Sequence, residues 1–142
     1  MLEFKLVKKE EIDTVIPLVE LLHNAPTADV LKERFAEMVT QNYECVGVYL
    51  AQKLIGCAGL WIQTRHYSGR CLEPDHVIVH PDYQSQQVGE KLVQFFFEYA
   101  KAKGCIVTEL NCYIPNTKAQ AFWERMGYQK IGYHYILRPI TA

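Results

Sequence analysis

The sequence lacks a long apolar run, a basic cluster and a leader-like N-terminus. The first residues, MLEFKLVKKEEID, carry charges instead of the apolar block of a signal peptide. No stretch is apolar for the 18 or more residues that a spanning helix needs. Lysine and arginine number 15 against 16 aspartates and glutamates, so the charge is balanced. We therefore expect a cytoplasmic protein that binds neither membrane nor nucleic acid.

The cysteines and histidines lack a metal-binding pattern. There are five cysteines and no C-x-x-C pair. His76 and His80 are four residues apart, but they lie in a segment that reads as a strand. The sequence therefore predicts no metal site, and it predicts small buried thiols in a reducing compartment. The cysteines are Cys45, Cys57, Cys71, Cys105 and Cys112.

The composition is that of one ordinary globular domain. Apolar residues make up 49% and charged residues 22% of the chain. A chain of 142 residues is long enough to bury a substantial core. Repeats and linker-like tracts are absent from the sequence, so we expect a single domain over residues 1–142.

Hydrophobic periodicity indicates two helices followed by three strands. Residues 10–23 repeat at helical intervals, with Pro17 as an interruption, and Thr27 is a candidate N-cap for a second helix. The period then changes to two. Segments 44–51 and 54–63 predict a hairpin closed at residues 52–53, and a third strand follows over residues 71–81.

The second half predicts a strand–helix–strand crossover. Residues 85–103 have a wide apolar face, and Gly104 stands where a helix would end. Residues 105–112 predict the next strand, which should run parallel to the third by a right-handed connection. A short helix over 116–126 and a last strand over 128–137 complete the order. The fold class is therefore α+β, with antiparallel strands leading into one parallel βαβ unit and helices on both faces of the sheet.

The turn QSQQVG, residues 84–89, lies between the third strand and the long helix. Ligands of such sheets bind beyond the carboxyl ends of the strands. A helix start offers amide N–H groups and partial positive charge, which suit a diphosphate. The turn has a single glycine, which is sufficient because backbone N–H donors do not depend on side-chain identity. We expect Gln87 to have φ below zero; a φ above zero would cost about 1 kcal/mol or more.

Two segments together resemble a known family. The run VIVHPDYQSQQVGEKL, starting at Val77, is similar to the coenzyme A signature of the GNAT superfamily of acyl-CoA-dependent N-acyltransferases. Gln84 and Gly89 match its first and last positions, and Gln87 replaces its usual middle glycine. The run NTKAQAFWERMGY, starting at Asn116, resembles a second stretch of the family. The likeness extends from about Ala51 to Tyr128.

The resemblance implies that acetyl-CoA is the acyl donor. In this family the fourth and fifth strands splay apart and the pantetheine arm lies between them. The residues that would contact the donor are Val77, Ile78, Val79, Gln84, Ser85, Gln86, Gln87, Val88, Gly89, Glu90, Asn116 and Trp123. Asn116 has an alternative role as the N-cap of its helix, and Trp123 an alternative role in packing.

The resemblance also implies transfer of the acyl group to an amine. An ammonium with a pKa near 10 must lose a proton before it attacks, and a carboxylate can take it. Glu73 and Asp75 lie two apart on a strand and therefore share a face, and both remain candidates. The tyrosine that often protonates the departing thiolate is replaced by Trp123. Either the thiolate leaves unassisted, or Tyr113, Tyr133 or Tyr135 substitutes, or catalysis is poor.

We therefore predict an N-acetyltransferase that acts on a primary amine of a small molecule or peptide. The alternative is a coenzyme A-binding protein of the same fold with little or no catalysis. Aromatic and acidic residues near the expected acceptor site, among them Glu20, Trp61 and Tyr67, suit a cationic amine. The aromatic segment YHYIL makes a homodimer possible through edge pairing.

Overall fold

The computed structural model describes residues 1–141, and for Ser85 and Gln86 it describes the backbone alone. The chain packs as two compact units, Met1–Leu110 and Asn111–Ala142. The single domain over 1–142 stays a prediction. No helix within the described residues is long and apolar enough to cross a membrane.

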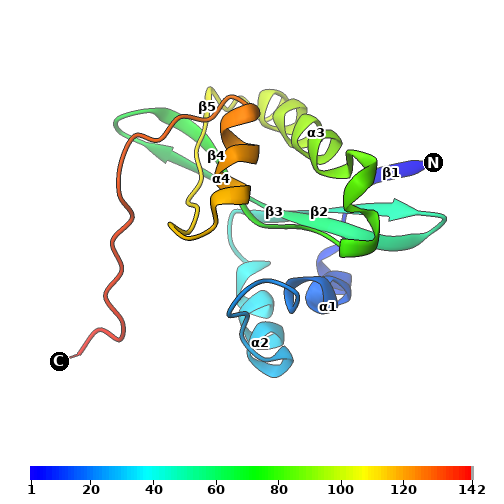
Figure 1. The fold of residues 1–142 in the computed structure, drawn as a ribbon. Coiled ribbons are helices and arrows are strands. Elements are labelled where there is room, and N and C mark those ends of the chain that lie inside the picture. Colours follow the sequence, from blue (N-terminus) through cyan, green and yellow to red (C-terminus); the bar gives the residue numbers. More distant parts are fainter. Residues whose placement is uncertain (142) are drawn as a thin grey trace. The chain divides into compact units, whose positions relative to one another are not determined.

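The first unit contains a mixed sheet of five strands in the order β1-β2-β3-β4-β5 (Figure 1). Strands β1 to β4 are antiparallel neighbours, and β5 is parallel to β4. This confirms the predicted fold class. The strands are β1 Leu2–Leu6, β2 Tyr43–Leu50, β3 Lys53–Arg65, β4 Gly69–Val79 and β5 Val107–Thr108.

Strand β1 was not predicted from the sequence, because it is only five residues long and two of these residues, Glu3 and Lys5, are charged. It pairs with β2 at the edge of the sheet, where Lys5 and Glu3 remain exposed. The β2–β3 hairpin was predicted correctly, but its turn lies at Ala51 and Gln52, which both have positive φ. These strand ends show the usual uncertainty of a prediction from pattern alone.

Helices cover both faces of the sheet, as predicted (Figure 1). On one side lie η1, a 3-10 helix, with α1 and α2. On the other side lies α3, which follows the 3-10 segment η2. Thr27 occupies the N-cap position of α2, although its side chain makes no capping hydrogen bond. The bounds in the first unit are η1 Lys9–Val15, α1 Ile16–Val19, α2 Ala28–Met38, η2 Pro81–Gln86 and α3 Val88–Ala102.

Each face of the sheet has its own apolar core. Under α1 and α2, Val15 and Phe35 are buried together with Tyr43 and Cys45 of β2. On the other face, Leu92 and Phe96 of α3 are completely buried. Each large side chain buried in this way contributes about 1.5–3 kcal/mol to folding. The two cores fix the positions of β3 and β4, which carry the site described below.

Strand β4 contains a bulge at residues 76–77. Asp75 pairs with Gly59 and Ile78 pairs with Cys57, so β4 has one residue more than β3 between these pairs. His76 has a φ of 35°, a backbone conformation that costs a non-glycine residue about 1–3 kcal/mol. The bulge directs the His76 ring toward Tyr43 and Phe35 on the α1–α2 face.

The parallel pairing of β4 with β5 is brief. It joins Cys71 to Val107 and Leu72 to Thr108, while β4 continues to Val79. The predicted strand over residues 105–112 is therefore wrong in its length, since β5 has two residues. Strand structure ends where the ladder with β4 ends. The divergence of the two strands agrees with the expected splay.

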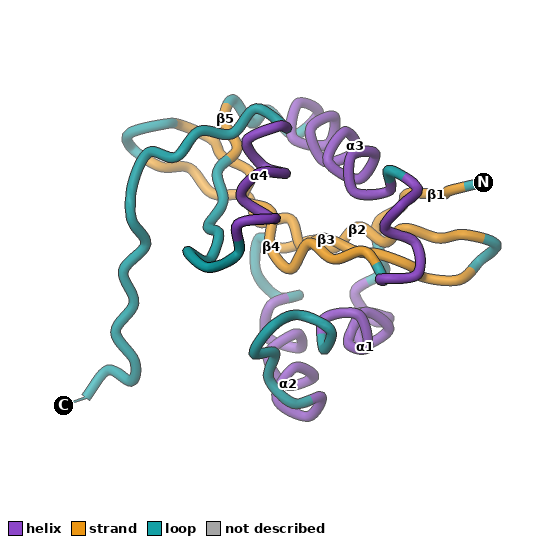
Figure 2. Tube along the Cα trace, in the orientation of Figure 1, coloured by secondary structure: helices purple, strands orange, loops and turns teal. Residues whose placement is uncertain are grey.

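The second unit contains α4, Thr117–Arg125, and no strand within its described residues. The predicted last strand over 128–137 is wrong, and Figure 2 draws this segment as loop. Its alternating apolar residues are exposed, including Tyr133 at 86% and Tyr135 at 88%. Alternation alone does not make a strand, because a strand needs a hydrogen-bonded neighbour. Pairing of this segment with a second copy stays a prediction.

Gly59 is required by the bulge. A Cβ at this position would lie 2.5 Å from His76 Nε2 and 2.8 Å from Tyr43 Cε1. We expect Gly59→Ala to lower the free energy of unfolding by about 1–3 kcal/mol in a denaturant titration. Gly132→Ala is the control, because a Cβ there meets no atom within 4 Å. Equal stability of the two variants would contradict this account of the bulge.

Candidate functional site

The turn after β4 is held by hydrogen bonds to the sheet. The amide of His80 donates to the Ile55 carbonyl of β3 at 2.8 Å. The Gln84 side chain donates to the Val79 carbonyl at 3.0 Å. The amide of Tyr83 closes η2 onto the His80 carbonyl at 2.9 Å. The side chain of Gln84 therefore anchors the turn, and its predicted contact with the acyl donor stays a prediction.

Gln87 is the N-cap of α3 and has φ 58° and ψ 24°. The expectation of a negative φ is wrong, and the left-handed alternative applies. The usual glycine at this place in the family pattern is explained, since glycine adopts this conformation without strain. Gln87 is exposed, so its side chain does not obstruct the helix start.

The first turn of α3 is the place where the sequence predicts an anion-binding site, and that site stays a prediction. Amide N–H groups in the first turn of an α-helix have no acceptor within the helix. Together with the helix dipole, they favour a negative ligand at Val88–Glu90. Gly89 lies here and is half-buried. The side chains of Ser85 and Gln86 lie outside the described residues.

Val77, Ile78 and Val79 form the end of β4, and η2 connects this end to the start of α3. Ile78 packs against the α1–α2 core and Val79 is 9% exposed. Their side chains therefore serve packing, as a core strand requires. Beyond Leu72 the strand no longer follows β5, so this is the part of β4 that a splayed sheet leaves for ligand pairing. A ligand with amide groups fits such an edge.

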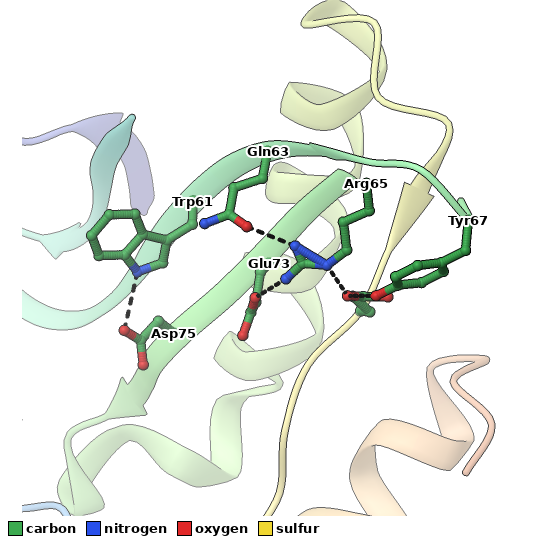
Figure 3. A network of polar contacts seen from close by, with 7 residues as sticks. Trp61, Gln63, Arg65, Tyr67, Glu73 and Asp75 are labelled. Carbon is green, nitrogen blue, oxygen red and sulfur yellow. Dashed lines mark hydrogen bonds and ion pairs between the residues drawn. The ribbon is translucent and has the colours of Figure 1, made fainter. Parts of the chain in front are cut away.

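Arg65 is the centre of a polar network on the α1–α2 face (Figure 3). Its Nε donates to Glu109 Oε1 at 2.6 Å, and Nη2 donates to Glu73 Oε1 at 2.9 Å. Nη1 donates to Gln63 Oε1 at 2.6 Å. Tyr67 donates its hydroxyl to the same Glu109 oxygen at 3.0 Å. The network thus ties together β3, β4 and the residue that follows β5.

Asp75 lies beside this network with a different environment. The indole Nε1 of Trp61 donates to Asp75 Oδ2 at 3.2 Å, and the amide of His76 donates to Oδ1 at 2.8 Å. Both donors are neutral, and the side chain is exposed. Glu73, in contrast, forms an ion pair with Arg65. The two predicted base candidates share a face, as expected, but they differ in charge environment.

The net charge of the site is negative. Arg65 supplies one positive charge against the carboxylates of Glu73, Glu109 and Asp75. Burial lowers the pKa of Arg65, but its hydrogen bond to Glu73 and the charge of Glu109 outweigh burial and raise the pKa. The guanidinium of Arg65 therefore stays positively charged, and the carboxylates of Glu73 and Glu109 balance its charge. The remaining negative charge of the site favours a cationic ligand.

Sequence reasoning missed Gln63, Glu109, Tyr43 and His76 as members of this region. Glu109 is the one charged residue in the run CIVTEL, which was a usable signal. Tyr43 and His76 gave no signal, because their contact depends on the bulge. The Tyr43 hydroxyl lies 2.5 Å from His76 Nε2, and the Tyr43 ring lies 4.9 Å from that of Trp61.

The second unit holds three other predicted site residues. Asn116 Oδ1 accepts a hydrogen bond from the Ala119 amide at 3.1 Å, so its N-cap alternative is realised. Trp123 packs edge-on against Phe122 and Tyr128 at 5.0 and 5.4 Å between centroids. Tyr113 is 67% exposed. Contacts of Asn116, Trp123 and Tyr113 with the acyl donor stay predictions.

Comparison with known proteins identifies the family. The model of the acetyltransferase (GNAT) family matches residues 15–128. The chain belongs to the acetyltransferase (GNAT) family. Members of this family are acyltransferases, and the expected family and enzyme class are thereby confirmed.

Two curated relatives are N-acetyltransferases. The aminoalkylphosphonate N-acetyltransferase of Salmonella typhimurium is 25% identical over 136 residues, which span 94% of this chain and 88% of the relative. The glucosamine 6-phosphate N-acetyltransferase of Arabidopsis thaliana is 24% identical over 135 residues, spanning 87% of this chain and 89% of the relative. Both act on amines, as their names state.

Solved structures confirm the GNAT fold. AAC(6')-Iy, in complex with a bisubstrate analogue of coenzyme A, matches with a TM-score of 0.85 at 15% identity, covering 99% of each chain. In the GNAT family the acyl donor is acetyl-CoA. The helix start after β4 and the divergence of β4 from β5 are the features of this chain that suit such a donor.

Strain at Gln87 can be measured directly. We expect Gln87→Gly to raise the free energy of unfolding by about 0.5–1 kcal/mol, because glycine removes the left-handed strain. Gln94→Gly is the matched control, since Gln94 is exposed within α3. This control should lower stability by about 1 kcal/mol. A loss of stability in both variants would show that the position-87 backbone is not left-handed in solution.

Proposed function

We propose that this protein transfers an acetyl group from acetyl-CoA to a primary amine of a small, cationic molecule. The observation that carries the proposal is the negatively charged network of Glu73, Asp75 and Glu109 on β4 and beside β5. Membership of the family supports acetyl-CoA as the acyl donor, and the charge of the network supports a cationic acceptor. The curated relatives support a small molecule over a peptide.

The donor site uses backbone groups. In the proposed complex, amide N–H groups at Val88–Glu90 bind the diphosphate, and the backbone of Val77–Val79 pairs with the pantetheine amides. An N–H of the same strand polarises the thioester carbonyl. Gln84 supports the site indirectly, since its side chain holds the turn against the Val79 carbonyl.

The acceptor site selects for positive charge. The names of the curated relatives describe amines that carry phosphonate or phosphate groups. A basic residue that binds such an anion must have charge to spare, whereas Arg65 here is held by Glu73 and Glu109 at 2.9 and 2.6 Å. We therefore propose an acceptor without an anionic group, bound by carboxylates and by the exposed faces of aromatic side chains.

Asp75 is the base in this proposal. The amine nitrogen attacks the thioester carbon, its proton passes to a carboxylate, and the carbon–sulfur bond breaks to release the coenzyme A thiolate. Glu73 is not assigned this role, because it already forms an ion pair with Arg65 at 2.9 Å. Asp75 accepts hydrogen bonds from two neutral donors, Trp61 Nε1 and the His76 amide, and it is exposed to an incoming amine.

Donor binding is tested by calorimetry with acetyl-CoA. We expect Gly89→Glu to weaken binding about tenfold or more, because its carboxylate would face the diphosphate at the helix start; tenfold corresponds to about 1.4 kcal/mol. Gln94→Glu adds the same charge farther along the exposed side of α3 and should bind as the unmodified protein does. Absence of binding to the unmodified chain, or equal weakening by both variants, would refute the donor site.

The base is tested by kinetics on a panel of small amines. We expect Asp75→Asn to lower kcat/KM about 100-fold near pH 7, with a smaller loss for Glu73→Gln. The Asp75→Asn deficit should shrink as the pH rises toward the amine pKa near 10, because free amine then needs no base. Glu98→Gln, on the exposed side of α3, is the control and should retain activity.

One result would contradict the assignment of Asp75 as the base, and another would contradict the proposed acceptor class. A pH-independent deficit of Asp75→Asn would mean that the residue orients the amine without taking its proton. Preference for phosphate-bearing amines over their neutral or cationic analogues would contradict the acceptor class. Donor binding without turnover on any amine would instead favour a coenzyme A-binding protein that lacks catalysis.

A further inference from the structure

Three side chains of the type that bind metal ions converge under the β4 bulge. They are Cys45 of β2, Cys57 of β3 and His76 of β4, and their ligand atoms all lie within 4.8 Å of one another. Cys57 Sγ is 3.7 Å from His76 Nδ1. Both cysteines are buried, with exposures of 1% and 0%. The acetyl-transfer chemistry proposed above makes no use of this cluster.

We propose that Cys45, Cys57 and His76 bind one Zn²⁺ ion. Zinc is bound by thiolate sulfur at about 2.3 Å and by imidazole nitrogen at about 2.0–2.1 Å in tetrahedral geometry, which sets ligand sulfur and nitrogen about 3.6 Å apart. The 3.7 Å between Cys57 and His76 fits this spacing. Two cysteines and one histidine are also a ligand set that zinc uses when its fourth position remains open.

The charge balance favours a divalent ion. Two thiolates, a neutral imidazole and a divalent cation sum to zero, whereas a monovalent ion would leave one uncompensated charge in an apolar core. Burying a net charge is costly, so neutrality decides between ions that thiolates can bind. Binding releases one proton from each thiol to solvent, and two sulfur–metal bonds and one nitrogen–metal bond form.

The imidazole is prepared for this role by its other nitrogen. The Tyr43 hydroxyl lies 2.5 Å from Nε2, where it can accept that N–H and leave Nδ1 facing the sulfur atoms. Such an outer partner is typical of histidines that bind metal. Burial lowers the pKa of His76, which keeps the ring neutral. Gly59 provides the space for the ring.

Simple packing of the two thiols explains fewer features of this cluster than metal binding does. Without metal, Cys45 donates to the Val46 carbonyl at 3.7 Å, and the hydrogen bond with Cys45 together with burial raises the pKa of the Cys57 thiol. Packing alone would accept an apolar residue at position 76. It does not require a histidine in a left-handed conformation with φ 35° and a tyrosine on its far nitrogen.

The test measures metal content and the ligand spectrum of the full chain. The protein is purified under reducing conditions, incubated with Zn²⁺ and freed of excess ion. We expect about one zinc per chain by elemental analysis, and Co²⁺ in place of Zn²⁺ should give thiolate-to-cobalt charge-transfer absorption. Tyr43→Phe, which retains the three ligands, should weaken zinc binding about 10–100-fold.

Cys57→Ala should abolish both signals, and Cys71→Ala is its matched control. Cys71 is equally buried on β4 but does not belong to the cluster. Melting curves of both variants verify folding, and a Cys57→Ala chain that does not fold is replaced by His76→Asn. A metal-free wild type, full retention of zinc by Cys57→Ala, or a disulfide between Cys45 and Cys57 would overturn the proposal. None of these readouts depends on acetyl transfer, so failure here leaves the proposed function intact.

Discussion

The bulge in β4 is the constraint on which the rest of the structure depends. One extra residue between Asp75 and Ile78 rotates the end of the strand relative to β3. The same strand has already parted from β5 after Leu72. As a result an acidic side chain, a half-buried imidazole and a strand end that pairs with β3 but not with β5 lie within a few residues of β4. Removing the extra residue would turn every following side chain to the other face.

The strain of the bulge is held by its surroundings. His76 adopts φ 35° and Gln87, at the other end of the turn, adopts φ 58°. Unfavourable backbone conformations persist where neighbouring structure determines them, and they gather at functional sites. Here the Tyr43 hydroxyl holds the His76 ring by a hydrogen bond, and Gly59 leaves room for the ring because it has no Cβ. The hydrogen bond from the Gln84 side chain holds the turn.

The polar network shows how position changes the meaning of a residue type. Glu73 and Asp75 look equivalent in the sequence, two residues apart on one strand. In the structure Arg65 reaches Glu73 and not Asp75, because β3 places Trp61 beside Asp75. An arginine in such a region would suggest an anionic substrate, but Arg65 already forms ion pairs with two carboxylates. The proposed preference for cations follows from this count of charges.

The sequence by itself determined the family, the mixed sheet, the helices on both faces and the turn at 84–89, because periodicity and short motifs are local properties of the chain. Only the tertiary structure decided the left-handed backbone at Gln87 and the missing strand at 128–137, since both depend on neighbours distant in sequence. The convergence of Cys45, Cys57 and His76 is likewise a feature that only the tertiary structure decided. Three strands must pair in register, with one residue extra in β4, before these side chains meet.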